Sequence, residues 1–251
     1  MIGVMILFIS IKKNTIIYGF LILLVASLLL LCCAVKEAAC DVEATGASSP
    51  LSDKIILVDP GHGGFDAGAS ANGLFEKDIN LSVAKKLKLW IEENGGKVVM
   101  TREEDVSTAD QSKSGGSAKA SDLKRRKAMV DESGADLFVS IHMNKFPEEQ
   151  YWGAQVFYAT SSDESKRLGE AIQKAVKDTM SDGNERVAKK SDGGIFLLKD
   201  VKVPSVIVEC GFLSNHTDAE KLKTEDYQNK IAFGICMGIN NYFAHAEKSD
   251  I

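Results

Sequence analysis

Two histidines in this sequence each follow an apolar, β-branched run. His62 lies in VDPGHGG (residues 58–64) and His142 lies in SIHMN (residues 140–144), and a third apolar run ends at Glu209. Continuous apolar runs separated by helical segments are typical of buried parallel strands. Residues just past the carboxyl ends of such strands meet in one crevice. Two imidazoles and a carboxylate at one sheet edge suggest a metal site with hydrolytic chemistry.

Catalytic zinc usually takes three protein ligands and leaves a fourth position for water. The chain has four histidines, of which His216 lies in a predicted turn and His245 lies near the tail. The two strand-end histidines therefore need one more ligand. Glu76 follows His62 closely and can fold back over the same sheet edge, which leaves Glu209 free to act on water as a base.

Two residues next to these candidates have more than one interpretation. Asp59 either orients a ligand by accepting its hydrogen bond or caps the Pro60-Gly61 turn. Cys210 adjoins Glu209 and suggests a nucleophile, but a small buried cysteine is more often a core residue, and the core interpretation is favoured.

The composition is that of a globular protein, with 251 residues, 45% of them hydrophobic, and a net charge of −5. An acidic balance argues against a nucleic-acid partner, because phosphate binding needs a basic face. The dense basic run at residues 124–127 is interpreted as a solvated helix face.

The N-terminus is predicted to be separate from the folded domain. Two lysines precede an uncharged stretch at residues 14–35, near the length that crosses a bilayer. We predict that residues 1–35 form a membrane anchor, with a signal peptide cleaved after Ala34 as the alternative. Residues 36–53 are predicted to be a flexible spacer. Residues 54–246 are predicted to be the catalytic domain, followed by a tail at 247–251, with the domain outside the cytoplasm.

Strands and helices alternate along the predicted domain. This pattern predicts an α/β fold with an open, mostly parallel sheet flanked by helices on both faces, and the metal site at the carboxyl ends of the strands. The expected strands are at 55–58, 98–100, 137–141, 154–158 (an edge strand) and 206–208. The expected helices are at 78–94, 121–133, 163–180 and 227–243, with a short helix opened by a capping box from Thr217 to Glu220. The polar segments 103–119 and 182–194 are long loops of unassigned role.

From residue 55 to 243 the chain resembles the zinc-dependent N-acetylmuramoyl-L-alanine amidases of the amidase 3 family. The motifs that carry the resemblance are VDPGHGG with FDAG (58–68), FEKDINL (75–81), TR (101–102), ADLFVSIHMN (135–144) and PSVIVECGFLSN (204–215). The resemblance implies that His62, Glu76 and His142 hold Zn²⁺ and that Glu209 is the catalytic carboxylate. The implied substrate is peptidoglycan, cleaved at the amide between N-acetylmuramic acid and L-alanine. The sequence leaves open whether an activator protein is needed as a partner.

The layout is most similar to the family members that act on spore cortex, because one domain follows an anchor and no wall-binding repeat is present. That similarity implies a role in muramic lactam formation and germination. The alternatives are a vegetative cell-separation amidase, another zinc hydrolase such as a peptidase or deacetylase, and a peptidoglycan-binding scaffold without activity. Glu209 argues against the scaffold, because a binding module needs no base there.

Overall fold

The computed structural model describes residues 22–27, 48–109, 118–160 and 162–249. The chain divides into two units, Met1–Ser48 and Ser49–Ile251. In the first unit the structure describes the helical residues 22–27, so most of the predicted anchor and spacer lies outside the described residues. Within the described part of the chain, no helix combines the length and the apolar character needed to span a bilayer.

The second unit alternates strands and helices, as the sequence predicts. Its strands are β1 (Ile55–Pro60), β2 (Ser70–Ala71), β3 (Leu74–Phe75), β4 (Lys97–Met100), β5 (Leu137–Asn144), β6 (Gln155–Tyr158), β7 (Lys189–Lys190) and β8 (Ser205–Phe212). Its helices are α2 (Glu76–Glu93), α3 (Ala118–Glu132), α4 (Asp163–Met180), the short 3₁₀ helix η1 (Phe196–Leu198), α5 (His216–Leu222) and α6 (Glu225–Ser249).

Six strands form one open sheet in the order β4-β1-β5-β8-β6-β7. The four strands β4, β1, β5 and β8 are parallel, and β6 runs antiparallel to β8. The prediction of an edge strand at residues 154–158 is wrong in one respect, because the two-residue strand β7 pairs along the outer side of β6. β1 and β5 are adjacent and parallel, so the segments that follow them lie side by side.

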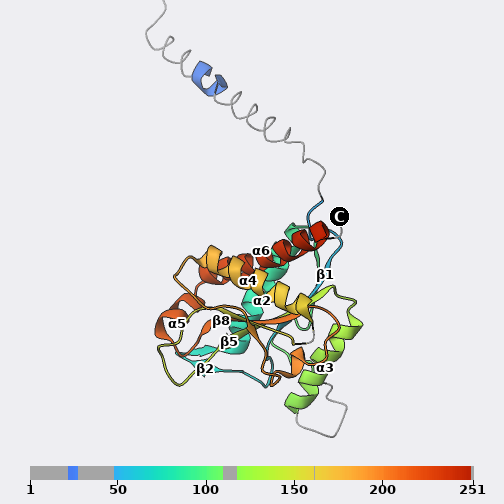
Figure 1. Ribbon diagram of the computed structural model, residues 1–251. Coiled ribbons are helices and arrows are strands. Elements are labelled where there is room, and N and C mark those ends of the chain that lie inside the picture. Colours follow the sequence, from blue (N-terminus) through green and yellow to red (C-terminus); the bar gives the residue numbers. More distant parts are fainter. Residues whose placement is uncertain (1–21, 28–47, 110–117, 161, 250–251) are drawn as a thin grey trace, which may run out of the picture. The chain divides into compact units, whose positions relative to one another are not determined.

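Helices cover both faces of this sheet, which confirms the predicted fold class (Figure 1). One face packs against α2, α4 and α6, and its core includes the side chains of Val58, Val139 and Val208. The other face packs against α3 and η1. The strands are buried on both faces, which explains why they appear in the sequence as continuous apolar runs.

The side chains of β8 point alternately to the two faces of the sheet. Val206, Val208 and Cys210 belong to the core beneath α2, α4 and α6, whereas Ile207 belongs to the opposite face. Since successive strand residues point to opposite faces, Glu209 lies on the same face as Ile207.

The helices match the predicted ranges, with differences at their ends. The predicted capping box at Thr217 is wrong, because Asn215 is the N-cap of α5 and its side chain accepts a hydrogen bond from the Asp218 amide. At the other end of the unit, α6 continues to Ser249, into the segment predicted as a tail.

Candidate metal centre and active site

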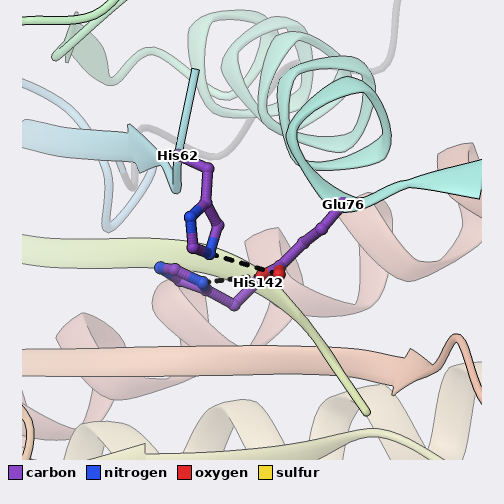
Figure 2. Close-up of side chains that lie close together, drawn as sticks. All are labelled: His62, Glu76 and His142. Atoms are coloured by element: carbon purple, nitrogen blue, oxygen red, sulfur yellow. Dashed lines mark hydrogen bonds and ion pairs between the residues drawn. The ribbon is translucent and has the colours of Figure 1, made fainter. Parts of the chain in front are cut away.

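Three side chains converge at the carboxyl edge of the sheet, as Figure 2 shows: His62, Glu76 and His142. His62 follows β1, His142 lies near the end of β5, and Glu76 is the first residue of α2. Nε2 of His62 lies 3.2 Å from Oε2 of Glu76. Nδ1 of His142 lies 2.9 Å from Oε1 of the same carboxylate. The structure thus brings together the three residues that the sequence predicted as metal ligands.

A short β-hairpin determines where α2 begins and therefore where Glu76 lies. Strands β2 and β3 pair antiparallel around Asn72 and Gly73, which both have positive φ. Positive φ at both central residues is typical of a type I′ turn, which favours Asn-Gly. α2 starts directly after the hairpin, two residues earlier than predicted, so Asp78 lies in its first turn and is not its cap. The Asn72-Gly73 pair is the sequence signal for this start.

The Glu76 carboxylate is held by backbone as well as by the histidines. Oε2 accepts a hydrogen bond of 2.7 Å from the Ala69 amide, and Oε1 accepts one of 3.1 Å from the Met143 amide. Burial alone would raise the pKa of Glu76, but hydrogen bonds to His142 and His62 outweigh it and hold that pKa well below its usual range. Glu76 is therefore a carboxylate, the form that binds a cation.

Asp66 sets the orientation of the first histidine. Nδ1 of His62 lies 2.9 Å from Oδ2 of Asp66, so this nitrogen donates its proton and Nε2 is left facing Glu76. An imidazole whose second nitrogen donates to a carboxylate is the usual arrangement at metal sites. Residue type and spacing do not identify Asp66 as part of the site, although its position within FDAG is a signal for it.

The absence of a side chain at Gly61 lets the second histidine approach the first. A β-carbon at Gly61 would lie 2.3 Å from Nε2 of His142. The His62 and His142 rings meet edge to face, with centroids 5.0 Å apart. Burial lowers the pKa of His142, but its hydrogen bond to the Glu76 carboxylate outweighs burial and raises the pKa overall.

The spacing of these donors fits a zinc ion. Two ligands about 2.1 Å from one zinc in a tetrahedral arrangement lie about 3.4 Å from each other. The measured nitrogen–oxygen distances of 2.9 Å and 3.2 Å are close to that value. One such atom from each of the three residues lies within 4.8 Å of the other two. Two imidazoles and one carboxylate are also a donor set of catalytic zinc, so the residues present fit the ion.

Glu209 lies one strand away from this cluster. Its Cα pairs in register with that of His142 on β5. Among the described residues, Oε2 of Glu209 is buried and has no hydrogen-bond partner. Burial raises the pKa of Glu209 to about 7. A buried carboxyl oxygen without a partner is costly, and one that titrates near neutrality is suited to proton transfer.

On the opposite flank of the site, a buried guanidinium holds the His62 loop. The side chain of Arg126 is 1% exposed and donates to the carbonyls of Pro60 and His62 and to the carboxylates of Asp59 and Asp122. The interpretation of residues 124–127 as a solvated face is therefore wrong for Arg126. Every fourth residue of α3 in this region is buried against the sheet: Asp122, Arg126 and Val130. The Arg126 guanidinium can be buried there because Asp59 neutralises its charge.

Asp59 itself matches neither of its two predicted roles directly. It is fully buried and accepts hydrogen bonds from Thr101, Ser140 and Arg126. Burial would raise the pKa of Asp59, but the Arg126 charge and these hydrogen bonds lower it overall. Asp59 acts on His62 through Arg126.

A second arginine completes this support. Arg102 donates from Nε to the Pro60 carbonyl at 2.9 Å and from Nη2 to the Gly61 carbonyl at 3.0 Å. Together with Arg126, it provides donors for three consecutive carbonyls, those of residues 60–62. His62 has a φ of 61°, a left-handed conformation that a non-glycine residue keeps only where its surroundings enforce it.

The remaining candidates lie away from the cluster. Cys210 is fully buried among the apolar core residues, and burial raises the pKa of its thiol, which confirms the core interpretation. His216 begins α5 and His245 lies in α6, both exposed.

Comparisons with known proteins agree with this geometry. The sequence profile of the N-acetylmuramoyl-L-alanine amidase family matches residues 56–241. The chain is 41% identical over 204 residues to the germination-specific N-acetylmuramoyl-L-alanine amidase of Bacillus subtilis (strain 168), covering 81% of this chain and 84% of that protein. It is 33% identical over 197 residues to the amidase LytC of the same organism, covering 78% of this chain and 36% of LytC.

A solved structure is similar over the same domain. It is the CwlD amidase of Clostridioides difficile in complex with the GerS lipoprotein, with a TM-score of 0.74, 42% identity, and coverage of 77% of this chain and 100% of that chain. The family predicted from the sequence motifs is thereby confirmed. The chain belongs to the N-acetylmuramoyl-L-alanine amidase family, whose members cleave peptidoglycan.

Proposed function

We propose that this protein is a zinc-dependent amidase that hydrolyses the bond between N-acetylmuramic acid and L-alanine. His62, Glu76 and His142 would hold the ion, and Glu209 is the catalytic carboxylate. One observation carries the proposal: Oε2 of Glu209 is buried with no partner among the described residues, and it lies beside a three-residue cluster of metal-ligand type.

Zinc at such a centre polarises a carbonyl oxygen and makes water acidic enough to attack at neutral pH. Glu209 takes one proton from the attacking water, whose oxygen bonds to the lactyl carbonyl carbon. The same carboxyl then gives that proton to the nitrogen of L-alanine as the carbon–nitrogen bond breaks. A pKa of about 7 suits both transfers, because neither protonation state of Glu209 is strongly favoured near neutrality.

Chain-end analysis of digested peptidoglycan tests this function. We expect the zinc-loaded domain to release free amino-terminal alanine and leave the glycan intact, and we expect Glu209→Gln to release none above background. New reducing sugar ends, or new amino groups other than that of alanine, would indicate a different hydrolase. Binding to peptidoglycan without any new chain end would favour the inactive scaffold.

The place of action is proposed to be the outer face of a membrane, next to newly made wall. Residues 1–35 would anchor the chain, residues 36–53 would act as a tether, and residues 54–246 would carry the activity. Support comes from the lysines before the uncharged stretch at 14–35, which favour an extracytoplasmic domain. A protein starting at Asp53 is expected to be soluble and to fold, and to cleave peptidoglycan fragments if no activator is required. An insoluble product that recovers only with the N-terminal segment attached would show that the segment belongs to the core.

The cellular role is proposed to be maturation of spore cortex. A muramic residue freed of its peptide keeps a lactyl carboxyl, which a later enzyme could close into muramic lactam. The similarity to a germination-specific amidase supports this role, and the GerS complex of the solved relative supports a lipoprotein activator as a partner. Deleting the gene is expected to give spores without muramic lactam that germinate poorly. Chains of unseparated vegetative cells with normal cortex would indicate a cell-separation amidase instead.

A further inference from the structure

A second arginine-centred feature lies on the far side of Glu209 from the histidines. Gln155 of β6 pairs in register with Glu209 of β8, so their side chains share one face of the sheet. Oε1 of Gln155 accepts a hydrogen bond of 2.9 Å from Nη1 of Arg186. Arg186 therefore lies one side chain beyond the catalytic carboxyl, although it comes from the loop before β7.

Three contacts hold the Arg186 guanidinium in place. Besides the bond to Gln155, its Nε donates to the Trp152 carbonyl at 2.7 Å, and its central carbon lies 4.6 Å from the centre of the Phe212 ring. A guanidinium that stacks on an aromatic ring and donates hydrogen bonds along one edge has a fixed orientation before a ligand binds.

The other side of this guanidinium has no partner in the part of the chain that the structure describes. Nη2 donates no hydrogen bond there, and no carboxylate within 4.0 Å forms an ion pair with Arg186. Partial burial lowers the pKa of Arg186. The Asp218 carboxylate acts on this charge from beyond 4.0 Å and opposes the shift, but it forms no ion pair with the guanidinium. A partly desolvated cation that is not paired with an anion attracts one, and a planar guanidinium with free N–H groups matches a carboxylate.

The guanidinium borders a surface cavity of about 440 Å³. Tyr151 and Trp152 line it with partly exposed rings, and Glu185 is the one carboxylate among its lining residues. The cavity lies toward the same edge of the sheet as the active site, because the ring of Tyr151 contacts that of Phe146, two residues after the end of β5.

We propose that Arg186 binds a carboxylate of the stem peptide while the muramoyl amide lies at Glu209. The inference rests on the proposed function and names the part of the substrate that this flank recognises. Adjacent strands are about 4.8 Å apart. The 2.9 Å hydrogen bond from Arg186 to Gln155 and the width of the guanidinium add about as much again, so Nη2 of Arg186 lies roughly 10 Å from the Glu209 carboxyl. An extended peptide covers that distance in about three residues. The carboxylate therefore belongs to the second or third residue of the stem.

A comparison of two substrates tests the assignment. One is a soluble muramoyl tripeptide with free peptide carboxylates, and the other is the same compound with each carboxylate converted to a carboxamide. We expect the wild-type protein to prefer the first in kcat/KM by about 10–100-fold, the scale of a hydrogen-bonded charge pair. In Arg186→Gln that ratio should fall toward one, and Arg186→Lys should keep part of it because the charge remains.

Arg167→Gln is the matched control, because it removes the same charge from α4, where Arg167 is exposed and pairs with Glu164. This variant should keep the wild-type preference. An Arg186→Gln protein that slows on both substrates equally would show a structural role and overturn the inference, as would an unchanged ratio. A wild-type protein that cleaves neither substrate, alone or together with the lipoprotein activator proposed above, would overturn the proposed function and this inference with it.

Discussion

The two flanks of the active site differ in how their polar groups are paired. On the braced flank, defined by Asp59, Arg102 and Arg126, the buried charges donate to or accept from protein atoms. On the open flank, defined by Glu209 and Arg186, one oxygen and one nitrogen have no partner in the described part of the chain. Both flanks lie at the same sheet edge, so the difference is not one of position in the fold.

The comparison indicates a division of work. Full pairing makes the braced flank rigid, because moving one group breaks several bonds, and this flank determines where His62 lies. Unpaired atoms make the open flank costly to fold but available to substrate. Variants of the braced flank should therefore change stability and metal binding, and variants of the open flank should change turnover. Four predictions test this division, from the largest expected effect to the smallest.

Replacing His142 by alanine should abolish stoichiometric zinc binding and reduce activity to background. The reason is that a site with two protein ligands binds zinc too weakly to retain it during purification, whereas a site with three retains it. Elemental analysis of the purified domain measures the metal. His216→Ala, at an exposed position on α5, is the control and should keep one zinc. One tightly held zinc in His142→Ala would show that the ligand assignment is wrong.

Glu209→Gln should lower kcat by about 10²–10⁴-fold, the range for losing a general base. Because this residue lies on the open flank, zinc content and melting temperature should stay at or above the wild-type values. Elemental analysis and thermal unfolding check both. Loss of zinc together with activity would make Glu209 a ligand and would contradict the proposed separation of roles.

Arg126→Met should destabilise the domain by about 3–5 kcal/mol, because it removes the cation that forms the ion pair with the buried Asp59 carboxylate. Arg125→Met is the matched control at the next position, where the side chain is 43% exposed and pairs with Glu132. It should cost about 0–1 kcal/mol, as exposed ion pairs do. Urea unfolding of the metal-free domain measures both variants, and equal effects would disprove the braced flank.

Asp66→Ala should weaken zinc binding by about 10–100-fold, the usual effect of removing a group that orients a histidine ligand. Its carboxylate fixes the His62 ring without touching the proposed ion position. Titration with a competing chelator measures the affinity. The control is Asp53→Ala, which removes an exposed carboxylate that pairs with Lys97. An unchanged affinity in Asp66→Ala would mean that Arg126 and Arg102 alone orient the loop.

The sequence predicts the braced flank less well than the cluster of His62, Glu76 and His142. His62 and His142 follow apolar runs, so strand periodicity alone indicates that they lie at one edge. Arg126 lies in a run of four basic residues, and charge alone favours the surface. Its burial depends on Asp59, which belongs to a strand far away in sequence. The ion pair between Arg126 and Asp59 follows from tertiary packing, and patterns of neighbouring residues in the sequence do not predict tertiary packing.

Of the two residues that define the open flank, the sequence predicts one. Glu209 ends an apolar run and was identified, whereas Arg186 lies in a polar loop whose role the sequence left unassigned. Its position depends on β6 running antiparallel to β8, which brings Gln155 opposite Glu209. The order and direction of strands beyond the parallel core are not given by hydrophobic periodicity, so the residue that follows from them was missed.

The separation of the three cluster residues along the chain also has a consequence for folding. Glu76 and His142 are 66 residues apart, and they meet only after β1 and β5 have paired. An unfolded chain has no assembled site, so zinc would favour the folded state alone, by about 2.7 kcal/mol at a hundred times its dissociation constant. The supply of metal would then influence how long each copy of the domain survives proteolysis.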